Sequence, residues 1–169
     1  MDFTRDILPL KNIIFRTALR IVLNREEAED IVQDCLVKIW HQAQNGERIL
    51  NLESYALTMA RNLALDRKAL ARNRVISLDE EVHDQEDEHQ LTPDQQLIAS
   101  ERTSLIKSII DSMPEKLRTI MQLRDIEGKS YREISTIMGI TEADVKVTLF
   151  RARKQVREAY LKIGIFDAN

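Results

Sequence analysis

The chain has 169 residues, of which 43% are hydrophobic and 5% aromatic, and its formal net charge is -3. Four glycines and three prolines are too few for a turn-rich β sandwich, and the abundance of Leu, Ile, Ala, Glu, Arg and Lys favours helices. The single cysteine, Cys35, excludes an internal disulfide and a cysteine-based zinc site, and the charges within residues 1–23 exclude a signal peptide or membrane span there, so we expect a cytoplasmic protein.

The first clear element is a helix over residues 28–40, AEDIVQDCLVKIW. Its apolar residues recur at the spacing of one buried stripe. These residues are Ala28, Ile31, Val32, Cys35, Leu36, Ile39 and Trp40. The opposite face carries Asp30, Gln33, Asp34 and Val37. Cys35 lies on the buried stripe, which predicts a small core residue rather than a nucleophile.

A turn signal at Asn45-Gly46 separates this helix from a second one over residues 54–74. Asn51 suits the N-cap of the second helix, and Glu53 suits its first turn. Tyr55, Met59, Leu63 and Leu70 lie near one face of this helix. The helix is basic, because one acid, Asp66, accompanies Arg61, Arg67, Lys68, Arg72 and Arg74.

An acidic segment, residues 77–100, divides the chain. Residues 79–101 carry a formal charge of -9, whereas residues 1–78 carry +2 and residues 102–169 carry +4. A segment so charged cannot bury enough apolar surface to offset the entropy of ordering it, so we predict a flexible linker. Whether it is a plain spacer or an interaction tail stays open. The predicted fold is all-α, with two small helical domains, 1–76 and 101–169, joined by this linker.

The second domain begins with a predicted helix over residues 97–113 and another from Pro114 to the stop signal at Gly128. Ser130 and Glu133 then form a capping-box pattern at the start of a third helix. Gly139 supplies a tight turn, and Thr141 repeats the N-cap pattern for a fourth helix.

The fourth helix has two distinct faces. Val145, Leu149, Ala152 and Val156 share one side at helical spacing. The other side carries Lys146, Val147, Phe150, Arg151, Arg153, Lys154 and Arg157. A helix, a glycine turn and a helix with a basic outer face predict a DNA-binding helix-turn-helix. Its positive charge suits phosphate oxygens, and the outward Val147 and Phe150 suit thymine methyl groups. The alternative, a helical bundle whose last helix is simply basic and binds no DNA, stays open.

The segments AEDIVQDCLVKIW, YALTMARNLALD and MPEKLRTIMQLRDIEGKSYREISTIMGITEADVKVTLFRARK resemble extracytoplasmic-function sigma factors of bacterial RNA polymerase. The resemblance covers most of residues 5–160 and includes both domains in the order of the family. It implies a transcription initiation factor that binds core RNA polymerase, reads the −10 promoter element with its N-terminal domain and reads the −35 element with its helix-turn-helix. It also implies an anti-sigma factor as a further partner.

The resemblance assigns roles to residues. Core polymerase binding falls on Asp30, Gln33, Asp34 and Val37. Recognition and melting of the −10 element fall on Arg48, Asn51, Arg61, Asn62, Asp66, Lys68 and Arg72, together with the loop 46–51. Contact with the −35 element falls on Thr141, Lys146, Val147, Phe150, Arg151, Arg153 and Lys154. The family often has a small polar residue at the position of Val147 and a basic one at that of Thr148, which affects the expected base preference.

Three other functional classes are alternatives to a sigma factor: an enzyme, a dimeric DNA-binding regulator and a protein-binding adaptor. An enzyme would need a catalytic or metal constellation, and only a cluster of His83, Asp84, Glu86 and His89 in the acidic segment is imaginable. We expect no cofactor and no metal. A dimeric helix-turn-helix regulator is the stronger competitor, but no βαβ pattern of a receiver domain precedes the motif. A protein-binding adaptor leaves both basic helices unexplained.

Overall fold

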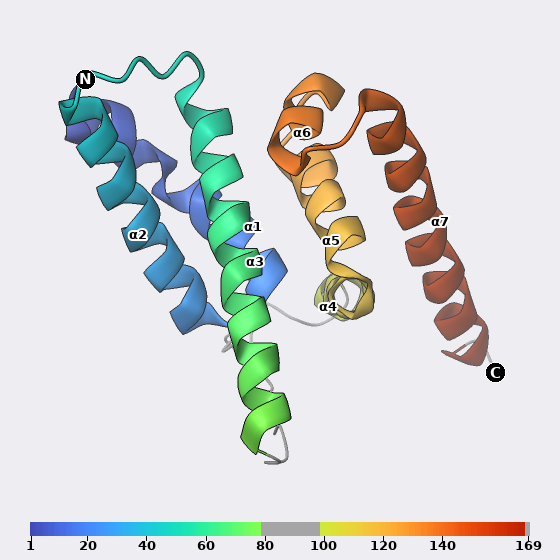
Figure 1. Cartoon of the computed structure of the whole chain (residues 1–169). Coiled ribbons are helices and arrows are strands. Elements are labelled where there is room, and N and C mark those ends of the chain that lie inside the picture. Colours follow the sequence, from blue (N-terminus) through green and yellow to red (C-terminus); the bar gives the residue numbers. More distant parts are fainter. Residues whose placement is uncertain (79–98, 168–169) are drawn as a thin grey trace.

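The computed structural model describes residues 1–78 and 99–167, and these residues contain helices and no strand (Figure 1). The all-α prediction is therefore confirmed, whereas the predicted linker lies almost wholly outside the described residues. In chain order the α-helices are α1 Lys11–Val22, α2 Arg25–Gln44, α3 Leu52–Leu78, α4 Ala99–Ser112, α5 Glu115–Met121, α6 Tyr131–Met138 and α7 Glu142–Asp167. Within the described ranges, no helix is long and apolar enough to span a membrane.

The N-terminal helices α1, α2 and α3 pack around one apolar core, which a short π-helical turn, Phe3–Ile7, also joins. The predicted stripe of α2 is confirmed, because Ala28, Ile31, Val32, Cys35 and Ile39 are all buried. Burial raises the pKa of the Cys35 thiol to about 12, which keeps it protonated and unreactive.

The N-cap of α3 sets where the helix begins, and small residues on its inner face set how closely it packs. Asn51 accepts a hydrogen bond from the backbone N–H of Ser54, as the sequence predicts. Ala56, Ala60 and Ala64 are fully buried, so α3 approaches its neighbours closely. Leu70, which shares the apolar spacing of the helix, is exposed.

The C-terminal helices form a second core around Ile120, Leu123, Ile134 and Leu149. The segment predicted as one helix from Pro114 to Gly128 is α5 followed by a π-helical turn, Gln122–Ile126. This turn contributes the buried Leu123 and ends at Ile126, and Gly128, two residues later, adopts a left-handed φ of 69°.

The two helical units pack against each other, with α6 against α3 and α5 against α1 (Figure 1). Leu57 of α3 is fully buried and belongs to the core of the C-terminal unit. The sequence predicts two domains but not this contact, because a helical period does not say which element covers each face.

Candidate nucleic-acid interface

The turn between α6 and α7 is fixed by local hydrogen bonds. Ser130 and Glu133 form the predicted capping box, with the Glu133 backbone N–H donating to the Ser130 hydroxyl at 3.1 Å. Gly139 ends α6 in the left-handed conformation at φ 67°. Thr141 then caps α7, since its hydroxyl accepts a hydrogen bond from the Asp144 backbone N–H at 3.1 Å. These contacts set the direction in which α7 leaves the turn.

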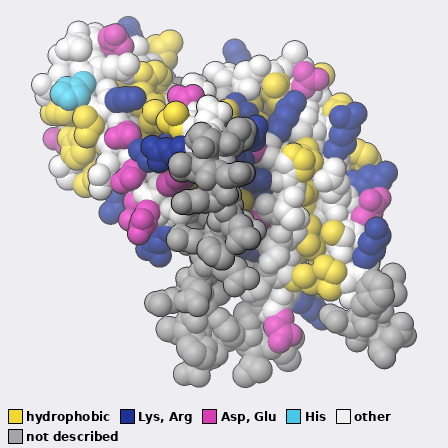
Figure 2. Space-filling model, turned by 60° about the horizontal axis from the view of Figure 1, so that its bottom comes forward, with side chains coloured by type: hydrophobic (Ala, Val, Ile, Leu, Met, Phe, Trp, Pro, Cys, Tyr) yellow, Lys and Arg dark blue, Asp and Glu magenta, His cyan; other side chains and the backbone are white. Residues whose placement is uncertain are grey.

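The outer face of α7 brings the predicted DNA-contacting residues together. Its inner face packs into the second core through Val145, Leu149 and Ala152. The exposed residues of the outer face are Lys146, Val147, Phe150, Arg151, Arg153 and Lys154, with Thr141 exposed at the start of the helix. Val147 and Phe150 are 48% and 64% exposed and lie three residues apart on the helix, so they form a small apolar patch on this face. Basic side chains recur along the right-hand edge in Figure 2, on the side where Figure 1 places α7.

Neighbouring groups hold two of these cations in place. Tyr131 of α6 presents its ring to the Arg124 guanidinium at 4.3 Å and to the Lys146 ammonium at 5.5 Å. Arg153 forms an ion pair with Asp125. Sequence spacing does not reveal these contacts, because both supporting segments come from outside α7.

Thr148, the position at which the family often has a basic residue, is buried in this chain. Its side chain therefore faces the core and does not contribute to the outer surface of α7. The outer surface instead depends on its neighbours Val147 and Phe150, which are both exposed.

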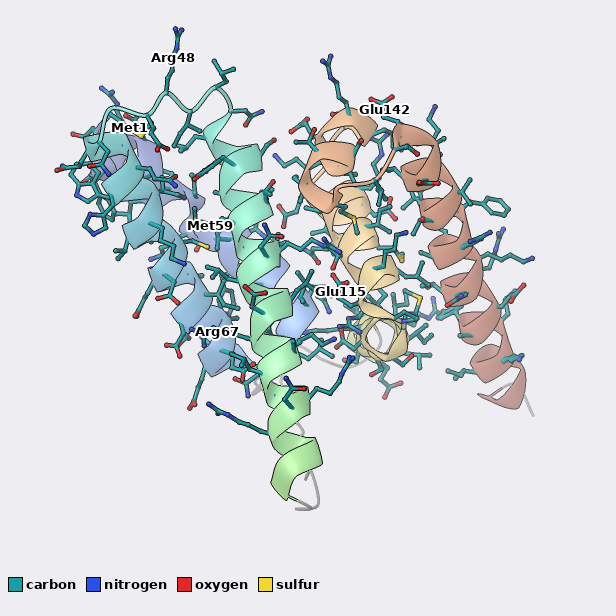
Figure 3. The ribbon with its side chains drawn as sticks, viewed as in Figure 1. Met1, Arg48, Met59, Arg67, Glu115 and Glu142 are labelled. Atoms are coloured by element: carbon teal, nitrogen blue, oxygen red, sulfur yellow. The ribbon has the colours of Figure 1, made fainter. Side chains whose placement is uncertain are left out.

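The predicted polymerase-binding residues form an exposed row along α2. Asp30, Gln33, Asp34 and Val37 are all exposed. Arg67 of α3 extends toward this row (Figure 3) and lies 3.6 Å from the Asp30 carboxylate and 3.2 Å from that of Asp34. The sequence gives Arg67 only as one cation of a basic helix, and the structure places it against the acids of α2.

The residues predicted for the −10 element do not form one continuous surface. Arg48 extends from the loop between α2 and α3, away from the body of the molecule (Figure 3). Leu50 in the same loop is 90% exposed. Asn51 is engaged as the cap of α3, and its side-chain oxygen is therefore already occupied.

Asn62 lies on a different side of α3 from Arg61. It lines a hollow of about 300 Å³ between α2 and α3. The other lining residues are Lys38, Tyr55, Thr58, Met59 and Leu63. Asp66 and Arg72, farther along α3, are exposed.

Arg61 and Lys68 face the C-terminal unit. The Arg61 Nε lies 3.5 Å from the Glu115 carboxylate of α5, and Glu115 sits between α3 and α5 in Figure 3. The pKa of Lys68 is lowered, mainly by burial and further by the nearby Arg118 cation. Within the described residues no three His, Cys, Asp or Glu side chains come together as a metal site. The cluster imagined at His83, Asp84, Glu86 and His89 lies outside those residues.

Comparison with known proteins matches both helical units. Residues 7–74 match the family model for sigma-70 region 2, and residues 104–156 match that for sigma-70 region 4. The ECF RNA polymerase sigma factor SigL of Mycobacterium tuberculosis is 31% identical over 156 residues, which cover 90% of this chain and 85% of that protein. The ECF sigma factor SigE of Mycolicibacterium smegmatis is 29% identical over 88% of this chain, although the match spans only 58% of that relative.

Two solved structures share the fold. The sigma factor RpoE of Bartonella quintana, in co-crystals with the anti-sigma factor NepR, superposes with a TM-score of 0.73 at 23% identity, covering 96% of this chain and 98% of RpoE. CnrH in complex with the cytosolic domain of CnrY gives a TM-score of 0.60 at 16% identity, covering 99% of this chain and 88% of CnrH. With both regions matched in order and a relative of 31% identity, the chain belongs to the extracytoplasmic-function (ECF) sigma factors of the sigma-70 family.

Proposed function

We propose that this sigma factor binds core RNA polymerase and directs it to promoters that carry two upstream elements. The observation that carries the proposal is the presence of region 2 and region 4 in one chain, in that order. The factor acts by positioning and needs neither a catalytic group nor a cofactor. The predicted domain boundaries, 1–76 and 101–169, enclose the two matched ranges and remain predictions.

Polymerase binding is assigned to the exposed row of α2, Asp30, Gln33, Asp34 and Val37. An acidic row with one apolar side chain suits a basic partner surface that also offers an apolar contact. Arg67 of α3 lies beside this row, within ion-pair distance of the Asp30 and Asp34 carboxylates. It also lowers the net negative charge of the row, so polymerase has to compete with an internal cation.

The −35 element is assigned to the outer face of α7. Arg151 and Lys154 are exposed cations that suit phosphate oxygens, which fix the register of a helix in the major groove. Val147 and Phe150 lie near the N-terminal end of α7, where side chains of a recognition helix reach base edges. Both are apolar, so thymine methyl groups are the chemistry that fits them.

The −10 element is assigned to the loop 46–51 and α3. A base extruded from the non-template strand loses its stacking and needs a pocket with polar groups on its edge. The hollow beside Asn62 has room for one unstacked base and a side-chain amide to read it. Arg48 and Arg72 are exposed cations that could follow the backbone of the opened strand.

An anti-sigma factor is proposed as the regulatory partner. Both solved structures of the same fold hold a second protein: the sigma factor RpoE is bound to the anti-sigma factor NepR, and CnrH is bound to the cytosolic domain of CnrY. The likeness extends over nearly the whole of this chain and therefore includes both helical units.

A dimeric helix-turn-helix regulator is not favoured, because that function does not explain the presence of region 2 in this chain. The two functions differ in when DNA is bound. We expect the purified factor to be a monomer that joins core polymerase in a one-to-one complex and shifts promoter DNA only within that complex. Analytical ultracentrifugation and a gel-shift titration, each with and without core polymerase, test this. A stable dimer that shifts specific duplex DNA without polymerase would favour the regulator.

A further inference from the structure

We infer that Arg67 of α3 couples the binding of core polymerase to the capture of the opened promoter strand. Polymerase takes over the two carboxylates of the α2 row that hold Arg67, and the released guanidinium then binds a phosphate of the strand. The inference rests on the proposed function, which assigns the row to polymerase and the hollow beside Asn62 to the strand. It adds a residue that neither assignment contains and a reason for the two binding events to depend on each other.

In the free chain the Arg67 guanidinium bridges two acids of α2. Its Nη1 lies 3.6 Å from the Asp30 carboxylate, and its Nη2 lies 3.2 Å from the Asp34 carboxylate. The Arg67 side chain is 31% exposed, whereas those of Asp30 and Asp34 are 62% and 50% exposed. Because the acids are more open than the cation that holds them, a basic partner surface can reach both carboxylates from solvent.

The position of Arg67 on α3 brings it close to the hollow proposed for the extruded base. Residues four apart on a helix are neighbours, so Arg67 lies one turn, about 5.4 Å, beyond Leu63. Leu63 and Met59 both line the hollow between α2 and α3. Figure 3 shows Met59 and Arg67 on the side of α3 that faces α2. A strand whose base occupies the hollow therefore has its backbone within reach of the long Arg67 side chain.

A guanidinium binds either kind of anion, because its planar fork matches both carboxylate and phosphate oxygens. Polymerase alone has to displace Arg67 from the acids, and the strand alone has to draw Arg67 away from them. When both partners are bound, the acids contact polymerase and Arg67 contacts a phosphate, so neither the acids nor Arg67 lose an ion-pair partner. Each partner therefore favours the binding of the other through the same side chain.

The size of this coupling follows from the exposure of the contact. A solvent-exposed ion pair contributes little net free energy, so releasing Arg67 should change an affinity by about two- to fivefold. High salt should weaken the coupling, because it screens exposed charges. Arg61 does not share this role, since its Nε lies 3.5 Å from the Glu115 carboxylate of α5, on a different side of α3 from the hollow.

The first test compares Arg67→Ala in the free factor and in its complex with core polymerase. The probe is a short DNA single strand of random sequence that carries fluorescein. Binding is read as energy transfer from fluorescein to a dye on Gln44→Cys, at the exposed end of α2. The buried thiol of Cys35 does not compete for this label. Because the factor is labelled before assembly, the signal reports only strand that the factor holds and not strand held elsewhere on polymerase.

We expect Arg67→Ala to leave the strand affinity of the free factor almost unchanged and to lower it about two- to fivefold in the complex, where Arg67 is released from the acids. Arg72→Ala is the comparison, since Arg72 is an exposed cation of the same helix and should cost the same factor in both states. Circular dichroism checks that each variant keeps its helix content. A loss from Arg67→Ala in the complex that is no larger than in the free factor overturns the inference. An equal difference between the two states for Arg72→Ala overturns it too, because polymerase then strengthens all backbone contacts alike.

The second test releases Arg67 without polymerase. Asp30→Asn with Asp34→Asn removes both carboxylates that hold Arg67. The matched control, Glu26→Gln with Glu101→Gln, removes two exposed acids that lie elsewhere. We expect the first pair to raise the strand affinity of the free factor about two- to fivefold above that of the control pair, and a further Arg67→Ala to remove this excess. No excess over the control, or an excess that persists with Arg67→Ala and therefore reflects net charge alone, overturns the inference.

The same measurements separate the inference from the proposed function. If the wild-type factor does not assemble with core polymerase, or if the complex does not hold the strand, the proposed function fails and the coupling fails with it. If the complex holds the strand and Arg67→Ala behaves alike in both states, only the coupling fails.

Discussion

The Arg67 guanidinium of α3 donates a hydrogen bond to the Asp34 carboxylate of α2 across 3.2 Å. Both side chains are partly open to solvent, so the pair adds little to the stability of the fold. The contact restrains the Asp34 carboxylate, which belongs to the row proposed to dock on core polymerase. Sequence periodicity places Asp34 outward but does not reveal that a cation from another helix is already bound to it.

The first prediction concerns this acid. Asp34→Lys should weaken assembly with core polymerase at least tenfold, because it reverses a docking charge and places it beside Arg67. Fluorescence titration of labelled factor with core polymerase measures the effect, and circular dichroism checks that helix content is unchanged. Glu158→Lys on α7 is the matched control, since it reverses one exposed acid far along the chain from α2. Normal assembly by Asp34→Lys excludes α2 as the docking row.

The second prediction separates two arginines of α7. Arg151 is exposed, whereas Arg153 is held by Asp125. Arg151→Ala should lower affinity for −35 duplex DNA and reduce the slope of log affinity against log salt by roughly one, as expected for one lost phosphate contact. Lys162→Ala, exposed on the same helix, serves as the control. An unchanged slope and affinity remove Arg151 from the interface.

Asp125→Asn gives the complementary result. It removes an anion near the DNA-binding face and releases the Arg153 guanidinium, so affinity for duplex DNA of any sequence should rise. Gel-shift titrations on specific and unrelated duplexes measure the rise. If affinity falls on both duplexes, Asp125 serves to position Arg153 rather than to neutralise it.

A third prediction addresses the exposed Val147. Replacing thymine by uracil at one −35 position removes a single methyl group and should cost about 1 kcal/mol of binding free energy. The substitution is made at each thymine in turn. Val147→Ala should remove the sensitivity at that one position and leave the others unchanged. Equal affinity for thymine and uracil at every position excludes the methyl contact.

The fourth prediction tests the turn of the helix-turn-helix. Gly139 has φ 67°, and nothing lies within 4 Å of a Cβ added there, so a substitution meets backbone strain but no clash. Gly139→Ala should reduce the free energy of unfolding by about 1 kcal/mol, and Gly139→Asn by less, because Asn tolerates the left-handed region better. Urea unfolding measures both variants. Equal losses for Ala and Asn contradict the account of this turn.

A fifth prediction concerns pH. Hydrogen bonding from Arg16 lowers the pKa of Glu127 below its ordinary value of 4.5. The Glu127 carboxylate therefore stabilises the contact between the two helical units fully above that value, and its contribution is lost as pH falls through the lowered pKa. Urea unfolding at a series of pH values below 4.5 should show this loss of stability, and Glu127→Gln should remove this part of the change. An identical acid response in Glu127→Gln shows that other groups control it.

The sequence predicts the helix-turn-helix well because its determinants are local. The capping box at Ser130, the left-handed Gly139 and the cap at Thr141 each depend on residues three or four positions apart. Helical spacing likewise places Val147 and Phe150 outward. None of these features depends on how distant parts of the chain pack, so pattern and structure agree.

Helical spacing does not predict which residues of α3 are buried where this helix packs against other helices. Leu70 shares the apolar spacing of the helix but is exposed, while the small residues Ala60 and Ala64 are fully buried. Small side chains allow helices to approach closely, and their burial is set by the neighbour rather than by their own hydrophobicity. For the same reason the sequence groups Arg61 with Arg67, although one faces α5 and the other faces α2.

Run-off transcription with core RNA polymerase over a genomic promoter pool, with and without this factor, tests the central claim most directly. We predict new start sites that depend on the factor and share two upstream sequence elements. Asp34→Lys should remove all of these starts, and Arg151→Ala should weaken them without moving them. No factor-dependent start at any promoter, with core polymerase shown to be active with another sigma factor, would contradict the account.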